Sequence, residues 1–169
     1  MSKFHKFISP DQYPEYTSDK LAIIGVNTST PFRSQAGRIR DEDIEYLKKY
    51  FSLVKSPQII KGVVVHHNII SYENLKGSSV LGNYKKFIDE MNKCGVDLIF
   101  AGHLHKSIIK SYNNTLLLQA GTCISKRLRH EDNTYLVIET GDEKITVSSR
   151  VYKESRYTEI NKSTYERFH

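Results

Sequence analysis

Two amphipathic helical patterns, set between three short apolar runs, constrain the fold of this chain more than any other feature. The runs are KLAIIGVNT, KGVVVHHN and VDLIFAG, at residues 20–28, 61–68 and 96–102. Runs this apolar suit strands that are covered on both faces. Strands that alternate with helices over short connections form a parallel sheet with right-handed crossovers. The chain up to residue 102 therefore predicts an α/β fold.

The two helical patterns carry clear signals for where each helix ends. The first, at residues 40–57, has acidic residues in its first turn and Pro57 beyond its end. The second, at residues 80–95, ends at Gly95, a typical C-terminal cap. Apolar side chains recur at helical spacing in both: Ile44, Leu47, Tyr50, Phe51 and Val54 in the first, and Val80, Tyr84, Phe87, Ile88 and Met91 in the second.

Four strand-like runs follow His105, where the helical patterns stop. They lie at residues 107–112, 115–121, 133–140 and 144–153, separated by turn residues, which predicts an antiparallel meander. The one Gly-Asp pair, Gly141–Asp142, lies between the last two runs and is interpreted as a hairpin turn. We expect residues 1–153 to form a single domain and the polar residues 154–169 to form a fraying tail.

Composition and charge narrow the functional classes. No run reaches the roughly 18 apolar residues that a membrane span needs, and the first residues lack the apolar region of a signal peptide. We therefore expect a cytoplasmic protein. The formal charge of +6 would suit an anionic partner. Because lysine and arginine are spread along the chain, this charge favours an anionic substrate over a nucleic acid.

Two histidine pairs follow consecutive predicted strands. His66 and His67 end one strand, and His103 and His105 end the next. The carboxyl ends of parallel strands meet at one edge of a sheet, and neutral imidazole is a common ligand of first-row metals. For any one histidine alone, a structural hydrogen bond is the more common role. Two pairs at one edge favour a shared site.

Four blocks resemble, in this order, the C-terminal half of the calcineurin-like metallophosphoesterases: GVVVHHN, DLIFAGHLH, LLLQAGT and NTYLVIE. LAIIGVNTS, followed by GRI and an acidic helix, is similar to the segment before them, particularly in the cyclic-nucleotide phosphodiesterase-like branch. The resemblance covers roughly residues 20–150. It implies one half of an αββα sandwich in which two divalent metal ions hydrolyse phosphomonoesters or phosphodiesters. Histidine and carboxylate ligands suit Mn, Fe, Ni and Zn alike.

The resemblance also implies roles for single residues of this chain. His66 and His103 look like ligands of one metal ion, and His105 looks like a ligand of the other. The implied reaction is an in-line attack on phosphorus by a hydroxide that bridges the two ions. His67 would orient a ligand or touch the substrate.

Two arginines follow the AGT block. Arg127 and Arg129 have guanidinium groups whose geometry suits phosphate oxygens, so they are candidates for substrate contacts. The alternative is that both belong to a solvated loop, and the sequence leaves the two interpretations open.

Three motifs of the family are absent from this chain: Asp-x-His, Gly-Asp-x-x-Asp and Gly-Asn-His. Three imidazoles without a bridging carboxylate do not hold two divalent cations at the required separation of about 3.5 to 4 Å. We therefore expect a truncated fragment, without a complete catalytic set, that becomes active when a companion chain supplies the missing ligands. The other possibility is a homo-oligomer, in which a second copy covers the apolar face that the missing half of the fold would otherwise cover. The alternative function is a non-catalytic scaffold or an inactive remnant of the same fold.

Overall fold

The structure, a computed structural model, describes residues 9–29, 37–70, 80–126 and 131–167. Its elements in chain order are β1 (Glu15–Thr17), β2 (Leu21–Gly25), α2 (Asp41–Leu53), β3 (Ile60–Val64), α3 (Tyr84–Lys93), β4 (Leu98–Ala101), β5 (Ile108–Tyr112), β6 (Thr115–Gln119), β7 (Thr134–Thr140), β8 (Lys144–Lys153) and β9 (Arg156–Glu166). None of the described helices is long and apolar enough to span a membrane.

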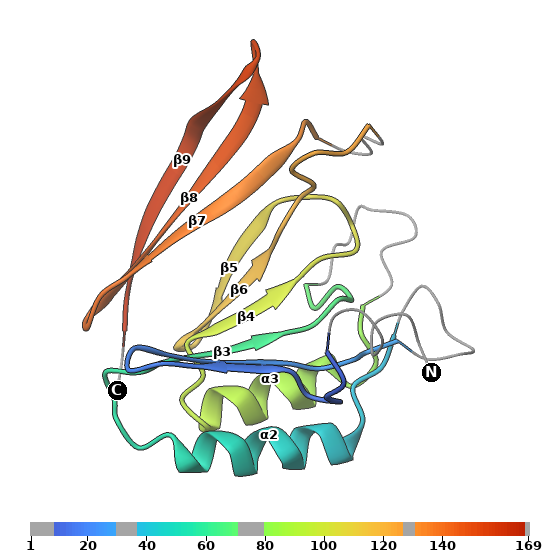
Figure 1. The fold of residues 1–169 in the computed structure, drawn as a ribbon, viewed down its shortest axis with the longest axis vertical. Coiled ribbons are helices and arrows are strands. Elements are labelled where there is room, and N and C mark those ends of the chain that lie inside the picture. Colours follow the sequence, from blue (N-terminus) through green and yellow to red (C-terminus); the bar gives the residue numbers. More distant parts are fainter. Residues whose placement is uncertain (1–8, 30–36, 71–79, 127–130, 168–169) are drawn as a thin grey trace.

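The elements form three layers (Figure 1). Helices α2 and α3 lie on one face of a six-stranded sheet with the order β1-β2-β3-β4-β6-β5, and a three-stranded sheet, β7-β8-β9, lies on its other side. Strands β2, β3, β4 and β6 run parallel, while β1 and β5 are antiparallel edge strands. The second sheet is entirely antiparallel. The predicted α/β class, a parallel part followed by an antiparallel part, is confirmed.

Alternate residues of the parallel strands face two separate cores. One core, against the helices, contains Ile24, Val63, Ile99 and Leu117. The other, against the second sheet, contains Ile60, Leu98, Leu116 and Leu118 from the first sheet and Ile145 and Val147 from β8. This alternation explains why the strands are apolar on both faces. The second sheet does not fully cover the first at Val64, which is 42% exposed.

Strand β6 departs from the predicted meander. It pairs in parallel with β4, from Leu98↔Leu116 to Ala101↔Gln119, and β5 folds back along its outer side. All five residues of β6 are buried, as is typical of a strand inside a sheet. The antiparallel meander therefore begins at β7, two strands later than expected.

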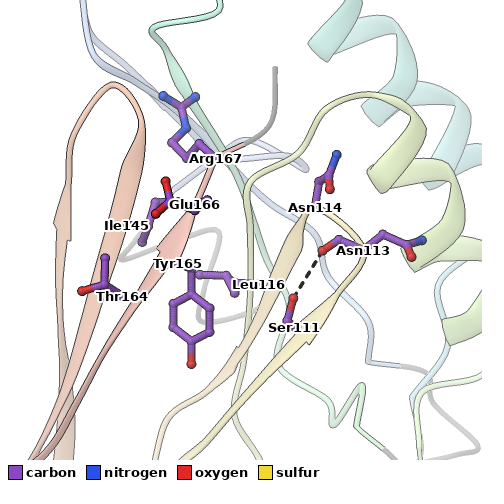
Figure 2. Close-up of a pocket in the computed structure, with 9 residues that line it drawn as sticks. All are labelled: Ser111, Asn113, Asn114, Leu116, Ile145, Thr164, Tyr165, Glu166 and Arg167. Atoms are coloured by element: carbon purple, nitrogen blue, oxygen red, sulfur yellow. Dashed lines mark hydrogen bonds between the residues drawn. The ribbon is translucent and has the colours of Figure 1, made fainter.

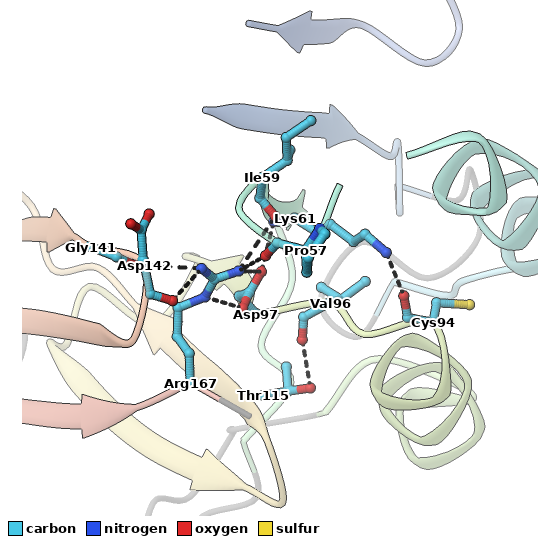
Figure 3. A network of polar contacts seen from close by, with 10 residues as sticks. All are labelled: Pro57, Ile59, Lys61, Cys94, Val96, Asp97, Thr115, Gly141, Asp142 and Arg167. Atoms are coloured by element: carbon cyan, nitrogen blue, oxygen red, sulfur yellow. Dashed lines mark hydrogen bonds and ion pairs between the residues drawn. The ribbon is translucent and has the colours of Figure 1, made fainter. Parts of the chain in front are cut away.

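The polar C-terminal segment does not fray, and that expectation was wrong. Residues Arg156–Glu166 form β9, which pairs with β8 along its whole length. Beyond it, the Arg167 guanidinium lies 2.8 Å from the Asp97 carboxylate and donates to the carbonyl oxygens of Pro57, Ile59 and Asp142 (Figure 3). The polar composition of β9 reflects an edge strand with an exposed outer face, rather than disorder.

A buried carboxylate, that of Asp43, lies in the first turn of α2. The Asp43 side chain accepts hydrogen bonds from the Arg40 guanidinium at 2.7 Å, the Arg40 backbone N–H at 2.9 Å and the Tyr13 hydroxyl at 2.7 Å. Burial alone would raise the pKa of Asp43, but these hydrogen bonds outweigh it and hold the pKa below its usual value. The same burial and contact raise the pKa of Tyr13 to about 12.

This arrangement predicts a loss of stability in acid. Because the pKa of Asp43 is lower in the folded state, its contribution is present above about pH 4 and is lost as the pH falls below that value. We expect Asp43→Asn to lower the free energy of unfolding by about 2 kcal/mol at pH 7, and by much less at pH 3. Urea unfolding at both pH values measures this. An equal loss at both would contradict it, and the exposed control Asp19→Asn is expected to change little at pH 7.

Candidate functional site

Backbone pairing beyond the ends of β3 and β4 brings the two histidine pairs to one edge of the sheet. The N–H of Val65 donates to the carbonyl oxygen of Phe100 at 2.9 Å, and the N–H of Gly102 donates to that of His66 at 3.1 Å. His66 therefore lies beside the start of the segment that carries His103. The edge predicted from the sequence is the one at which these residues lie.

His66, His67 and His103 form a cluster of three imidazoles. Each pair of ring centroids is 5.1 Å apart. His66 Nε2 and His103 Nδ1 are hydrogen-bonded at 3.2 Å in this structure. Two nitrogens that bind the same zinc ion at about 2.0 to 2.1 Å lie roughly 2.8 to 3.4 Å apart when the angle at the metal is about 90° to 109°. The separation fits a cation held by both rings, and His66 is exposed, so the position is open to solvent.

His67 is held differently from its neighbour. Its side chain is buried, and its Nδ1 lies 2.8 Å from the Thr28 hydroxyl, at the end of the β2 segment. Gly37, with a φ of +58°, packs against the ring, where a Cβ would lie 2.7 Å from His67 Cε1 and closer still to Nδ1. Thr28 and Gly37 thus fix the ring's orientation. This suits a group that orients a ligand rather than binding one directly.

His105 is not part of the three-ring cluster in the described chain. Its backbone φ is +55°, and its Nδ1 is buried without a hydrogen-bond partner among the described residues. Arg127 and Arg129 lie outside the described residues. The described residues contain no group of three or more histidine, cysteine, aspartate or glutamate side chains placed to hold a metal ion. His66 and His103 therefore form at most a partial metal site.

A cavity of about 290 Å³ lies at the other end of the strands. Ser111, Asn113 and Asn114 of the β5–β6 hairpin line one side, and Thr164, Tyr165 and Glu166 of β9 line the other (Figure 2). Leu116, at the amino end of β6, forms part of its wall. The histidines follow the carboxyl ends of β3 and β4, so the cavity is not part of the histidine site.

Sequence reasoning missed two residues that shape this site. Thr28 lies just beyond the carboxyl end of β2, so the rule that placed the histidines at that edge also selects Thr28. Gly37 belongs to the GRI block that precedes the acidic helix, but no local pattern indicates its contact with a ring that is 30 positions later in the chain.

Comparisons with known proteins bear on the fold. No protein-family model and no curated protein matches the chain. Among solved structures, GAP50, the anchor in the inner membrane complex of Plasmodium, matches with a TM-score of 0.59 and 17% identity over 93% of this chain. The match covers 54% of the GAP50 chain, so this chain spans about half of its length. At this identity the match shows a shared fold only.

Two further structures match at lower similarity. Vacuolar protein sorting 29 (Vps29) from Cryptosporidium parvum has a TM-score of 0.41 and 12% identity, covering 86% of this chain and 97% of its own. A predicted phosphoesterase from Streptococcus pneumoniae has a TM-score of 0.38 and 12% identity, with the same shares covered. Of these three structures, GAP50 is the one with a TM-score above 0.5, and the argument on the fold rests on it.

Proposed function

We propose that this chain is the C-terminal half of a metal-dependent phosphoester hydrolase. His66 and His103 would hold one divalent cation, and carboxylates of a companion chain or a second copy would complete the site. The observation that carries the proposal is the 3.2 Å separation of His66 Nε2 and His103 Nδ1, which suits two ligands of one ion. The cytoplasmic location remains a prediction from the sequence.

A bound divalent cation supplies Lewis-acid activation of water and of a phosphate oxygen. The residues of this chain would hold the cation and orient its ligands. His66 and His103 present their ring nitrogens at the open edge of the sheet, and Thr28 holds the His67 ring beside them. His105, whose Nδ1 is buried, is proposed as a ligand of a second ion by resemblance only.

The exposed part of the first sheet supports the need for a partner. Val64 alternates with Val63, which faces the helices, so its side chain lies on the face toward the second sheet. It is 42% exposed, which means that the second sheet leaves part of this apolar face open. A companion chain or a second copy that covers it would bury apolar surface and bring its own carboxylates near the histidines. A single monomeric species in sedimentation at all concentrations would count against the second copy.

Metal content tests the proposal directly. The purified chain is loaded with Zn²⁺ or Mn²⁺, dialysed, and analysed by plasma mass spectrometry beside His66→Ala, His103→Ala and the control His5→Ala. We expect about one ion per native chain, retained in His5→Ala and lost in both site variants, because one remaining imidazole binds a cation weakly. A native chain without metal, or equal retention in all variants, would overturn the proposal.

Hydrolysis tests the catalytic part. We expect no turnover of bis(p-nitrophenyl) phosphate by this chain alone, and metal-dependent turnover after addition of a chain that carries the three absent motifs. A chain that retains its metal but yields no turnover in any such mixture would leave the binding site in place and remove the catalytic claim.

A non-catalytic scaffold is the second candidate. It is favoured by the lack of a three-ligand group among the described residues and by the similar fold of GAP50, an anchor in the inner membrane complex of Plasmodium. If the native chain binds no metal ion and captures a defined partner through the open sheet face, this candidate is favoured over the first.

A further inference from the structure

The segment that carries His103 and His105 has an unfavourable backbone. Both residues have positive φ angles, +74° at His103 and +55° at His105. The left-handed region costs roughly 1 to 2 kcal/mol for a residue with a side chain, and such positions persist when their surroundings hold them. The segment from Gly102 to Ser107 lies between β4 and β5 and belongs to neither strand. Contacts from outside the segment must therefore fix its path.

Contacts at four points along the segment fix its path. At its start, the N–H of Gly102 donates to the carbonyl oxygen of His66 at 3.1 Å. In its middle, Leu104 is buried. At its end, the N–H of Ser107 donates to the carboxylate of Glu131, which belongs to the approach to β7. Just before Ser107, the side-chain amide of Gln119 on β6 donates to the carbonyl oxygen of Lys106 at 3.4 Å. Of these contacts, the one with Glu131 comes from the chain that leads into the second sheet.

Glu131 is itself held in place. Its Oε1 accepts a hydrogen bond from the Thr134 hydroxyl at 3.1 Å. Gly121 lies directly against both groups, since a Cβ there would be 2.8 Å from Glu131 Oε1 and closer still to Thr134 Oγ1. The absence of a side chain at Gly121 leaves room for the carboxylate to reach Ser107.

We infer that Glu131 is a positioning residue for the histidine site: its carboxylate holds the segment of His103 and His105 in the path that places His103 Nδ1 beside His66 Nε2. The inference rests on the proposed function for its link to cation binding. The contact of Glu131 with Ser107 involves only groups of the chain itself, and it requires no bound metal ion. Outer contacts that orient metal ligands are typically worth 10- to 100-fold in affinity.

The test compares Glu131→Ala, Glu131→Gln and the control Asp132→Ala, an exposed neighbour, in the full chain. Two quantities are measured: the dissociation constant for Co²⁺ by titration calorimetry and the exchange rate of the Ser107 amide by NMR. We expect Glu131→Ala to bind Co²⁺ about 10-fold more weakly and to exchange the Ser107 amide faster. Glu131→Gln keeps an oxygen acceptor and is expected to restore both, and Asp132→Ala should change neither.

The two readouts separate failure of this inference from failure of the proposed function. If the native chain binds Co²⁺ and Glu131→Ala binds it equally well, the positioning role is overturned. If the native chain binds no Co²⁺, the proposed function fails, and the positioning role is decided by exchange alone. Faster exchange from His103 to Ser107 in Glu131→Ala then supports it, and unchanged exchange overturns it. A folded far-UV spectrum for each variant confirms that global unfolding is not the cause.

Discussion

Replacing Arg167 with alanine is expected to lower the free energy of unfolding by about 3 to 5 kcal/mol, the range for removing one partner of a buried ion pair. The Arg167 side chain is 3% exposed and that of Asp97 is 12% exposed. In Arg167→Ala the Asp97 carboxylate loses its cation, although its Oδ2 still accepts the N–H of Lys61 at 2.8 Å. The carbonyl oxygens of Pro57, Ile59 and Asp142 also lose a donor.

Urea unfolding followed by circular dichroism measures this effect. Arg167→Lys keeps the charge but not the planar guanidinium that reaches several acceptors at once, so an intermediate loss is expected. Arg156→Ala, at the exposed start of β9, the strand that Arg167 follows, is the matched control and should change the free energy by less than about 0.5 kcal/mol. A loss below about 1 kcal/mol in Arg167→Ala would show that the pair contributes little to stability.

Gly37→Ala is expected to cost about 2 to 4 kcal/mol and to displace the His67 ring. The new Cβ would occupy space that the imidazole fills, and the φ of +58° is unfavourable for alanine. Relief requires the ring to move away from Gly37, and this displaces Nδ1 from its position 2.8 Å from the Thr28 hydroxyl. Urea unfolding gives the energy, and the ¹⁵N chemical shifts of the His67 ring report its displacement.

Gly102→Ala is the matched control at the same edge of the sheet. A Cβ there would lie 3.6 Å from the nearest atom, the carbonyl oxygen of His66, which is an ordinary contact. We expect a loss of less than about 1 kcal/mol and an unshifted His67 ring. Gly95→Ala separates the backbone cost from the contact, because Gly95 has a φ of +69° and a Cβ there would lie 3.8 Å from its nearest atom, Lys61 Nζ. Equal losses in Gly37→Ala and Gly95→Ala would show that backbone freedom, and not the contact with His67, sets the requirement for glycine at position 37.

Local patterns predicted the helices and the edge at which the histidines meet, because both depend on periodicity and on the direction of parallel strands. The order of strands was harder. The leucine-rich β6 is as apolar as β3 and β4, yet its pairing with β4 depends on contacts that no local pattern contains. The polar β9 was interpreted as a fraying tail for the same reason, since an edge strand with one exposed face resembles a tail in composition.

In the candidate site too, local patterns predicted some residues, and long-range contacts determined the others. All four histidines, His105 included, were predicted together from strand ends, and the structure clusters the rings of three of them: His66, His67 and His103. Glu131 showed no signal in the sequence, where it follows a basic segment and reads as a loop residue. Its contact with Ser107 joins positions 24 apart and depends on how the second sheet packs against the first.

The contact between Arg167 and Pro57 also bears on the order of folding. It joins residues 110 positions apart, and the ion pair with Asp97 joins residues 70 apart. Contacts between positions this distant form late, because the entropy of closing the intervening loop is lost before they contribute. On a ribosome, the helices and parallel strands are made before the segment that fastens the second sheet. Until then their inner face is exposed to other nascent chains, so the rate of synthesis of β7 to β9 sets how long this chain is prone to aggregate.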